Sequence, residues 1–492
     1  MEGEICIIAN REYVLDKYTK PDLCALPTVA ELRKALNDSY GSDTRAQLNL
    51  LFDEATFVEV GTYTKRGFSD FIATEKTSEL EGVITGYGAI DGKLVFAFAE
   101  DASRMGGAID ERHAKKIADI YSLALSNGAP VIGIFNSNGT PIFEGVAGLA
   151  AYGKIIASVT KASGVIPQIA LVTGNCLGTA AAIASMFDVV VTESSASLYV
   201  TSPALTGKKN TENAIVAYTG ALEQCAGYIR SIVSFLPSNS SIGVQCEEIC
   251  SDNLNRMLGN LDFGGDALSA ISVIADNSVF YEFSASYAPE VSTVFTIIGG
   301  VRCGVVANSF AKGEGKLNSL AARKIARFVN LCDSFSIPVV TLVDSLGLAI
   351  DKSEELFAPE LAKLAMAYAK STCPKVTVIM GHAIGASFVL LGSKALGADL
   401  VYTIDNAEIG ALNADSGVAF AWDKYITEEK TREELVSEWK ATVSSPSVAC
   451  ASGEIDDIIS VSEIRARICS ALLMLSAKNN VSGIARRKVL PL

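Results

Sequence analysis

The sequence GNCLGTAAA (residues 174–182) follows an apolar, β-branched run, and so does its near copy GHAIGASFV (residues 381–389). Each run reads as a strand, at 167–173 and 374–380, and each glycine-containing stretch opens into small residues that tolerate a helix. The chain therefore predicts a strand, a glycine turn and a helix, twice. The first N–H groups of a helix lack intrahelical partners and glycine allows close approach, so both turns suit anions and oxyanions.

The repeat extends well beyond the two turns. Six matches between the two halves have nearly the same separation in sequence. Three are 208 residues apart (338 − 130): Lys116-Ile117-Ala118 with Lys324-Ile325-Ala326, Pro130 with Pro338, and Gly107 with Gly315. Three are 207 apart (381 − 174): Pro167 with Pro374, Gly174 with Gly381, and Gly178 with Gly385. A tandem duplication of an α/β unit explains these matches. The Pro/Ser/Asn run at 236–241 then predicts two domains, residues 1–241 and 242–492.

Composition excludes some classes of protein. The chain has 492 residues, of which 49% are apolar and 20% charged, so it is long enough for two to four domains and is rich in apolar surface. We therefore expect extensive contacts between subunits. The net charge is −14 and no basic tract stands out, which argues against a nucleic-acid partner.

The ends of the chain and its cysteines bear on location and metal content. The stretch MEGEICIIANREY (1–13) is acidic where a signal peptide is basic, and apolar runs break before the roughly 18–20 residues of a membrane helix. We expect a soluble, cytoplasmic protein. Eleven cysteines fit reduced thiols, and Cys246 and Cys250 are the only close pair. With two histidines in the chain, a structural metal is not expected.

The remaining elements follow from periodicity. Asp91-Gly92 lies between two apolar runs and predicts a hairpin across 82–101, whose second-half counterpart is 294–309. The stretch GYGAIDG (86–92) is no dinucleotide loop, because it leads into a strand. Other predicted elements are helices at 32–52, 109–127, 319–335 and 360–372, strands at 129–135 and 338–343, loops at 136–145 and 344–359, and a solvated helical region at 420–480.

Several stretches resemble the carboxyltransferase subunits of biotin-dependent acyl-CoA carboxylases and of the related methylmalonyl-CoA and glutaconyl-CoA decarboxylases. They are residues 44–60, 82–117, 315–344, 393–402 and the closing ARRKVLPL at 485–492. The resemblance implies an α/β fold of two crotonase-like domains in tandem, from the ClpP/crotonase superfamily. It also implies a hexamer whose active site joins the acyl-CoA side, on the first domain of one subunit, to the biotin side, on the second domain of another.

The chemistry of that family agrees with what the two turns can do. Carboxyl transfer passes through a thioester enolate and a ureido anion, so the protein mainly stabilises two oxyanions and aligns them. The resemblance places the amides of Gly178 and Thr179 at the thioester carbonyl, and those of Gly385 and Ala386 at the ureido oxygen. Glycines that serve only close helix–strand packing are the alternative interpretation.

The resemblance also assigns substrate binding to Gly106, Gly107, Gly139 and Phe388. Some positions depart from the family pattern. Thr179 replaces the usual second glycine of the first turn, and Gly139 lies where the family has a Gly-Ala-Arg sequence. Phe388 occupies a position associated with acyl-chain choice. These departures leave the fold unchanged and bear on the substrate.

The sequence predicts structural roles for the two histidines. His113 begins a predicted helix and His382 lies inside the second turn. No carboxylate or serine is adjacent to either in sequence, so we expect a helix-surface residue and a turn residue bonded to backbone, with contact between either histidine and a ligand as the alternative.

The sequence also bears on the partner proteins and on alternative functions. No lysine is flanked by methionine as in a biotinylation site, so biotin must arrive on a separate biotin carboxyl carrier protein, with coenzyme A thioester as substrate. A biotin carboxylase subunit or a membrane decarboxylase subunit would complete the assembly. The alternatives are a crotonase-type hydratase or isomerase, for which Glu144 is the candidate base, and an inactive scaffold paralogue.

Overall fold

The structure is a computed structural model, and it describes residues 28–38, 42–65, 80–141, 144–201, 205, 215–247, 249–258, 265–351, 354–427 and 429–478. The stretches 1–13 and 485–492, used above for location and family resemblance, lie outside these residues. The predicted helix at 32–52 is two helices, α2 (Val29–Asp38) and α3 (Asp43–Leu51).

The first half of the chain forms a mixed sheet in the order β1-β2-β3-β4-β5-β6-β8, with β7 paired to β5. Strands β1 to β3 are antiparallel, and the pairs from β3 to β8 are parallel. The strands are β1 (Val58–Val60), β2 (Val83–Ile90), β3 (Lys93–Glu100), β4 (Val131–Ser137), β5 (Gln168–Leu177), β6 (Val189–Glu193), β7 (Ser197–Tyr199) and β8 (Val216–Gly220), and the helices that follow α3 are α4 (Glu111–Asn127), α5 (Gly145–Ala162), α6 (Thr179–Ser185) and α8 (Leu222–Phe235).

The second half repeats this arrangement as β16-β14-β13-β12-β11-β10-β9, with β15 paired to β13. Its strands are β9 (Phe280–Phe283), β10 (Val291–Ile298), β11 (Val301–Asn308), β12 (Val339–Ser345), β13 (Lys375–Ile384), β14 (Leu400–Ile404), β15 (Glu408–Gly410) and β16 (Asp457–Ile459), and its helices include α9 (Ala267–Ile274), α10 (Ser319–Ser334), α11 (Glu354–Lys370), α12 (Ala386–Leu390), α13 (Ala414–Gly417), α14 (Arg432–Thr442), α15 (Pro446–Ala451) and α16 (Ile464–Leu475). The bounds of β2, β3 and β4 recur in β10, β11 and β12 at the offset of 208. The predicted duplication and fold class are confirmed.

Two details show why both halves fold alike. The hairpin turn of the first half has positive φ at Asp91 (47°) and Gly92 (75°), the two-residue turn that matches strand twist. A buried lysine then ties the following helix to the sheet. Lys116 Nζ donates to the carbonyl of Val83 at 2.5 Å, and Lys324 Nζ, at the same place in the second half, donates to Val291 at 2.7 Å. Burial lowers the pKa of each lysine to about 8.

Two sequence expectations are wrong in detail. The loop expected at 344–359 is shorter, because α11 begins by Glu354 and includes Pro359. The buried side chains of Phe357 and Leu364 pack this helix onto the core, and that packing outweighs the hydrogen bond a proline removes. The region 420–480 is not simply a solvated helical pair, since it contributes the strand β16 and the buried helix α16. A three-residue strand is too short to give a periodic signal.

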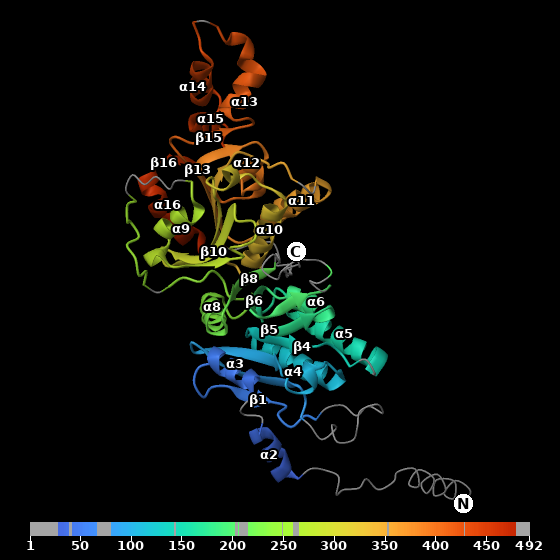
Figure 1. Cartoon of the computed structure of the whole chain (residues 1–492). Helices are drawn as coiled ribbons and strands as arrows, with labels where there is room; N and C mark the ends of the chain where they lie inside the picture. Colours follow the sequence, from blue (N-terminus) through green and yellow to red (C-terminus); the bar gives the residue numbers. More distant parts are fainter. Residues whose placement is uncertain are drawn as a thin grey trace, which may run out of the picture.

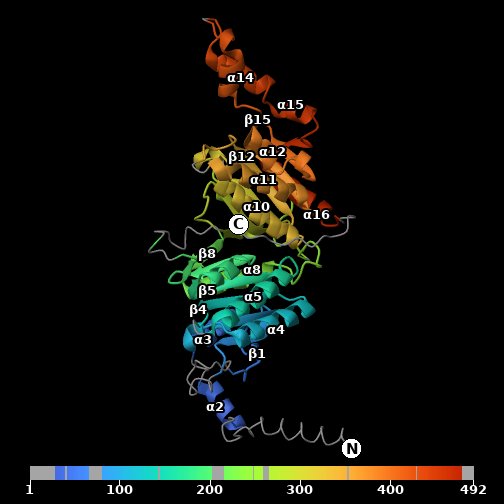
Figure 2. The same cartoon turned by 90° about the vertical axis from the view of Figure 1, so that its right-hand side faces the viewer.

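The halves stack end to end, first half blue to green and second half yellow to red, and α13 and α14 project from the far end of the second half (Figure 1). Helices α4 and α5 pack together in the first half, as do α10 and α11 in the second (Figure 2). The sheet edges meet where Ser284 N donates to Ala217 O at 2.8 Å. Beside them Arg327 donates to the carbonyl of Phe187 at 2.7 Å.

None of the helices in the described part of the chain is long and apolar enough to span a membrane.

Candidate active site

Each half carries its glycine turn at the end of the central strand. Gly178 follows β5 with φ 56° and ψ −120°, and Gly385 follows β13 with φ 59° and ψ −132°. This region of backbone space is open to glycine almost alone. The same unusual conformation at both repeated positions indicates that the turn itself, and not only close packing, is required.

The glycine amide of each turn is hydrogen-bonded within the fold. The N–H of Gly178 donates to Tyr199 O at 3.0 Å, and that of Gly385 donates to Gly410 O at 2.8 Å. Both amides therefore have an acceptor inside the fold, and their assignment to the thioester carbonyl and the ureido oxygen stays a prediction. The next residues, Thr179 and Ala386, begin α6 and α12, where an N–H has no intrahelical acceptor.

Three predicted binding glycines of the first half do lie together. Gly107 packs so closely on β4 that an added Cβ would lie 2.4 Å from Asn136 O. Gly106 accepts a hydrogen bond from Asn138 N at 2.9 Å, and Gly139 accepts one from Ile109 N at 3.1 Å. These contacts bring the β3–α4 loop against the end of β4.

Amide side chains then join this loop to the first turn. Asn175 Nδ2 donates to Asn138 Oδ1 at 2.7 Å, and Asn175 N donates to Asn136 Oδ1 at 3.3 Å. The surroundings of the first turn are consequently rich in neutral amides. Glu144, the expected base of a hydratase, lies at the start of α5 as its N-cap.

The second turn has titratable groups at the corresponding places. His382 N donates to Asp344 Oδ1 at 2.9 Å, and its ring Nδ1 lies 2.8 Å from the same oxygen. The ring stacks on Phe310 with centroids 4.7 Å apart. The interpretation of His382 as bonded only to backbone is wrong, because β12 supplies a carboxylate that sequence adjacency does not reveal.

His113 is not a surface residue. It is fully buried, and its Nδ1 lies 3.7 Å from Glu81 Oε1. Glu100, also buried, accepts from Asn136 N at 2.8 Å beneath the first turn. Burial raises the pKa of Glu100 to about 7, and the nearby His113 and the Asn136 amide oppose that rise. Helix periodicity did not predict that His113 is buried, because α4 packs both on the sheet and on α5.

A pocket of about 410 Å³ lies against the second turn. This size is within the range of small-molecule sites, about 300–1,000 Å³. Phe388 packs against the apolar core, and its predicted role in acyl-chain choice remains a prediction. The pocket is lined by Glu314, Lys316, Leu346, Gly347, Leu348, Ile384, Gly385, Ala386, Ala411, Leu412, Asn413 and Ser416.

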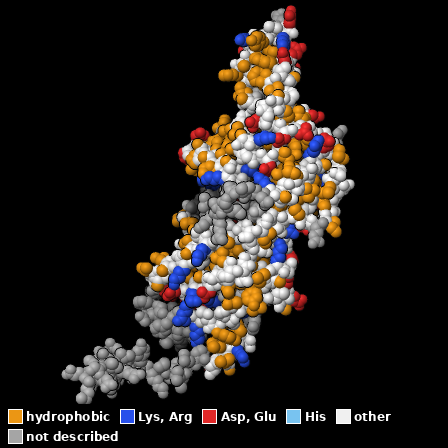
Figure 3. Space-filling model, turned by 180° about the vertical axis from the view of Figure 1, so that it is seen from behind, with side chains coloured by type: hydrophobic (Ala, Val, Ile, Leu, Met, Phe, Trp, Pro, Cys, Tyr) orange, Lys and Arg blue, Asp and Glu red, His pale blue; other side chains and the backbone are white. Residues whose placement is uncertain are grey.

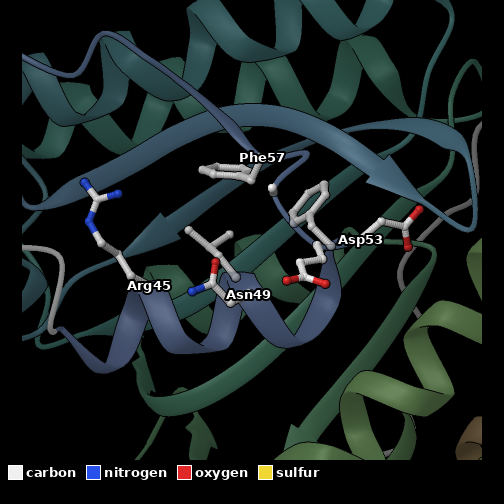
Figure 4. Close-up of a pocket in the computed structure, with 8 residues that line it drawn as sticks. Arg45, Asn49, Asp53 and Phe57 are labelled. Carbon is white, nitrogen blue, oxygen red and sulfur yellow. The ribbon is translucent and has the colours of Figure 1, made fainter.

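A second pocket, of about 430 Å³, lies between α3 and the segment that follows it (Figure 4). Arg45 and Asn49 come from α3, with Asp53 just beyond its end and Phe57 opposite. Two of its charged groups already have protein partners: Arg45 bonds Glu59 at 2.6 Å, and Asp53 accepts from Gly92 N at 3.0 Å. We assign this pocket no ligand.

The described residues contain no group of three or more His, Cys, Asp or Glu side chains able to hold a metal ion. Sequence reasoning missed the side chains that surround the turns. The offsets could have found them, because Asn136 corresponds to Asp344 at 208 (344 − 136) and Asn175 to His382 at 207 (382 − 175).

Two similar mixed sheets, each ending its central strand in a glycine turn, define an α/β protein of two crotonase-like halves. The carboxyl transferase domain model matches residues 39–221 and 209–490, which together span most of the chain. The chain belongs to the carboxyl transferase family, and its relatives are subunits of biotin-dependent acyl-CoA carboxylases and decarboxylases.

Relatives match over nearly their whole length. The methylmalonyl-CoA decarboxylase subunit alpha of Veillonella parvula is 33% identical over 91% of this chain and 92% of its own. The propionyl-CoA carboxylase beta chain of Saccharopolyspora erythraea is 32% identical over 91% and 90%. A solved structure of transcarboxylase 12S, described as a hexamer assembly with methylmalonyl-coenzyme A and methylmalonic acid bound, has a TM-score of 0.83 at 30% identity and covers 99% of this chain and 98% of its own.

Proposed function

We propose that this chain transfers a carboxyl group between carboxybiotin, carried on a separate protein, and an acyl-CoA. The Thr179 N–H stabilises the thioester enolate, and the Ala386 N–H stabilises the ureido anion. The observation that carries the proposal is the shared glycine conformation at Gly178 and Gly385, each followed by the first residue of a helix, whose N–H has no intrahelical acceptor. Fixed backbone donors are the groups that oxyanion chemistry uses.

The residues near the first turn suit acyl-CoA binding, and those near the second turn suit biotin binding. Gly106, Gly107 and Gly139 border the first turn, where their small size permits a thioester to approach. The pocket beside Ala386 has room for the fused ring of biotin. We assign the first half to acyl-CoA and the second half to biotin, and we keep the division at 1–241 and 242–492.

Assembly is part of the proposal. We propose a homo-hexamer, as transcarboxylase 12S is described, in which the first half of one subunit faces the second half of another. Exposed apolar side chains on the projecting segment suit such contacts (Figure 3): Phe420 is 86% exposed and Tyr425 51%. The partners we propose are a biotin carboxyl carrier protein and either a biotin carboxylase subunit or a membrane decarboxylase subunit.

The surroundings of the first turn favour carboxyl transfer over hydration. A hydratase needs a carboxylate base beside the oxyanion donors. The side chains bonded around this turn are the amides of Asn136, Asn138 and Asn175, and Glu100 is buried beneath them with one oxygen bound to a backbone amide. Neutral amides bind and orient a thioester without removing its proton.

A label-transfer assay tests the function. The purified chain is mixed with a carrier protein bearing ¹⁴C-labelled carboxybiotin and with acetyl-, propionyl- or butyryl-CoA in turn. Label recovered in the acyl-CoA supports the proposal. Hydration of crotonyl-CoA without label transfer would indicate a hydratase. Assembled protein with neither activity would indicate a scaffold.

A further inference from the structure

The duplication exposes one chemical difference between the two turns. In both halves the strand that ends in the turn donates a backbone N–H to a side-chain oxygen of the neighbouring strand. Asn175 N donates to Asn136 Oδ1 at 3.3 Å, and His382 N donates to Asp344 Oδ1 at 2.9 Å. The scaffold is the same, but a pair of amides in the first half is a carboxylate and an imidazole in the second.

The contacts of His382 fix its ring. Nδ1 lies 2.8 Å from Asp344 Oδ1, so Nδ1 carries a proton that it donates to the carboxylate. Phe310 stacks on the face of the ring at an interplanar angle of 18°. The side chain is 30% exposed and that of Asp344 19%. Nε2 is thus the nitrogen left for a ligand, in an orientation held by two neighbours.

His382 and Asp344 lie near the pocket of the second turn. His382 precedes the pocket residue Ile384 by two positions in β13, and residues two apart in a strand share a face. The loop that supplies Phe310 continues into Glu314 and Lys316, which line the same pocket. The ring does not itself line the pocket, and these neighbours in the chain place it next to the pocket, between β13 and this loop.

The other charged groups nearby are engaged with one another. Glu314 forms an ion pair with Lys316. Glu408, paired with His382 across β13 and β15, accepts from Ala414 N at 2.6 Å and lies 3.6 Å from Lys440. Among the described residues of this region, His382 is the side chain whose second polar atom, Nε2, has no protein partner and can take up and release a proton.

We propose that His382, oriented by Asp344, transfers a proton to and from the ureido nitrogen of biotin. The inference rests on the function proposed above. When the N–CO₂ bond of carboxybiotin breaks, CO₂ leaves and then bonds to the α-carbon of the acyl-CoA enolate. The nitrogen keeps the electron pair, the Nε2–H bond of protonated His382 breaks and a ureido N–H forms. Neutral His382 then regains a proton, the one that the acyl-CoA α-carbon releases as its enolate forms. The reverse reaction uses the same steps backwards.

Chemical modification tests whether His382 faces biotin. The chain has two histidines, and His113 is fully buried, so His382 should be the one histidine that diethyl pyrocarbonate modifies in the assembled protein. Free biotin should slow this reaction, and mass spectrometry of peptides identifies the site. Modification of His382 at an unchanged rate in saturating biotin would overturn the proposal.

The first half supplies the matched variants for turnover. His382→Asn retains a side-chain donor to Asp344 but cannot carry a proton, and adding Asp344→Asn reproduces the pair that the first half already accommodates. Each variant should assemble normally and lose about a hundredfold to ten-thousandfold in kcat, the usual range for general acid–base catalysis, with the KM for acyl-CoA unchanged. Imidazole in the buffer should partly restore turnover to His382→Gly.

The outcomes distinguish a failure of the proposed role of His382 from a failure of the proposed carboxyl transfer. A wild-type chain that transfers label and an equally active His382→Asn variant would overturn the role of His382 and leave the proposed function standing. A wild-type chain inactive with every acyl-CoA would overturn both.

Discussion

At the scale of single residues, the site depends on backbone donors. Ala386→Pro removes the N–H proposed to bind the ureido oxygen, while proline is compatible with the first position of a helix. Turnover should fall about a hundredfold to a thousandfold, as when one oxyanion donor is lost. Ala386→Ser keeps the N–H and serves as the control. An assembled Ala386→Pro protein with wild-type turnover would make the second turn purely structural.

The raised pKa of Glu100 predicts how the stability of the folded protein depends on pH. Its pKa is raised from 4.5 to about 7 by burial, so the folded protein binds this proton more tightly than the unfolded chain does. Raising the pH from about 5 to about 8 therefore removes stability, by up to on the order of 3 kcal/mol. Glu100→Gln keeps an acceptor for Asn136 N and should abolish this loss. Urea denaturation of both proteins at the two pH values measures it, and parallel pH dependences would contradict the assignment.

At the scale of elements, the two turns should be sensitive to a single methyl group. Nothing lies within 4 Å of a Cβ added at Gly178, so Gly178→Ala meets no clash and its cost is backbone strain, about 1–3 kcal/mol. The strain should turn the Thr179 N–H away and lower turnover. Gly153→Ala is the control, since it too has open space but lies in the interior of α5. Equal activity of the two variants would show that the glycine conformation is dispensable.

Most elements could be predicted from the sequence, and the charged groups of the site could not. Periodicity and the Asp91-Gly92 turn are local signals, and they placed the hairpins, the central strands and both glycine turns. The pairing of His382 with Asp344 depends on strands that are neighbours only in the fold. The hydrogen bond from Gly178 N to Tyr199 O likewise depends on the pairing of β7 with β5. Local patterns do not report contacts of that kind.

At the scale of the whole molecule, Arg327 joins the halves. Its guanidinium donates to the carbonyls of Phe187 and Asp188, and burial lowers its pKa to about 10. Arg327→Met leaves these acceptors unpaired and should cost about 1–3 kcal/mol. Lys115→Met, which breaks an exposed pair with Asp119, should cost less than about 1 kcal/mol. Thermal unfolding of the two variants measures the difference, and equal losses would mean that Arg327 does not hold the halves together.

The placement of one turn in each half of an elongated chain has a genetic consequence (Figure 1). Suppose that each active site is formed by the first turn of one subunit and the second turn of another. A chain disabled by Gly178→Ala then keeps an intact second turn, and a chain disabled by Ala386→Pro keeps an intact first turn. Co-expressed from two plasmids, the two alleles should complement, with part of the wild-type activity returning in mixed hexamers although neither allele works alone. Centres confined to one chain would give no complementation.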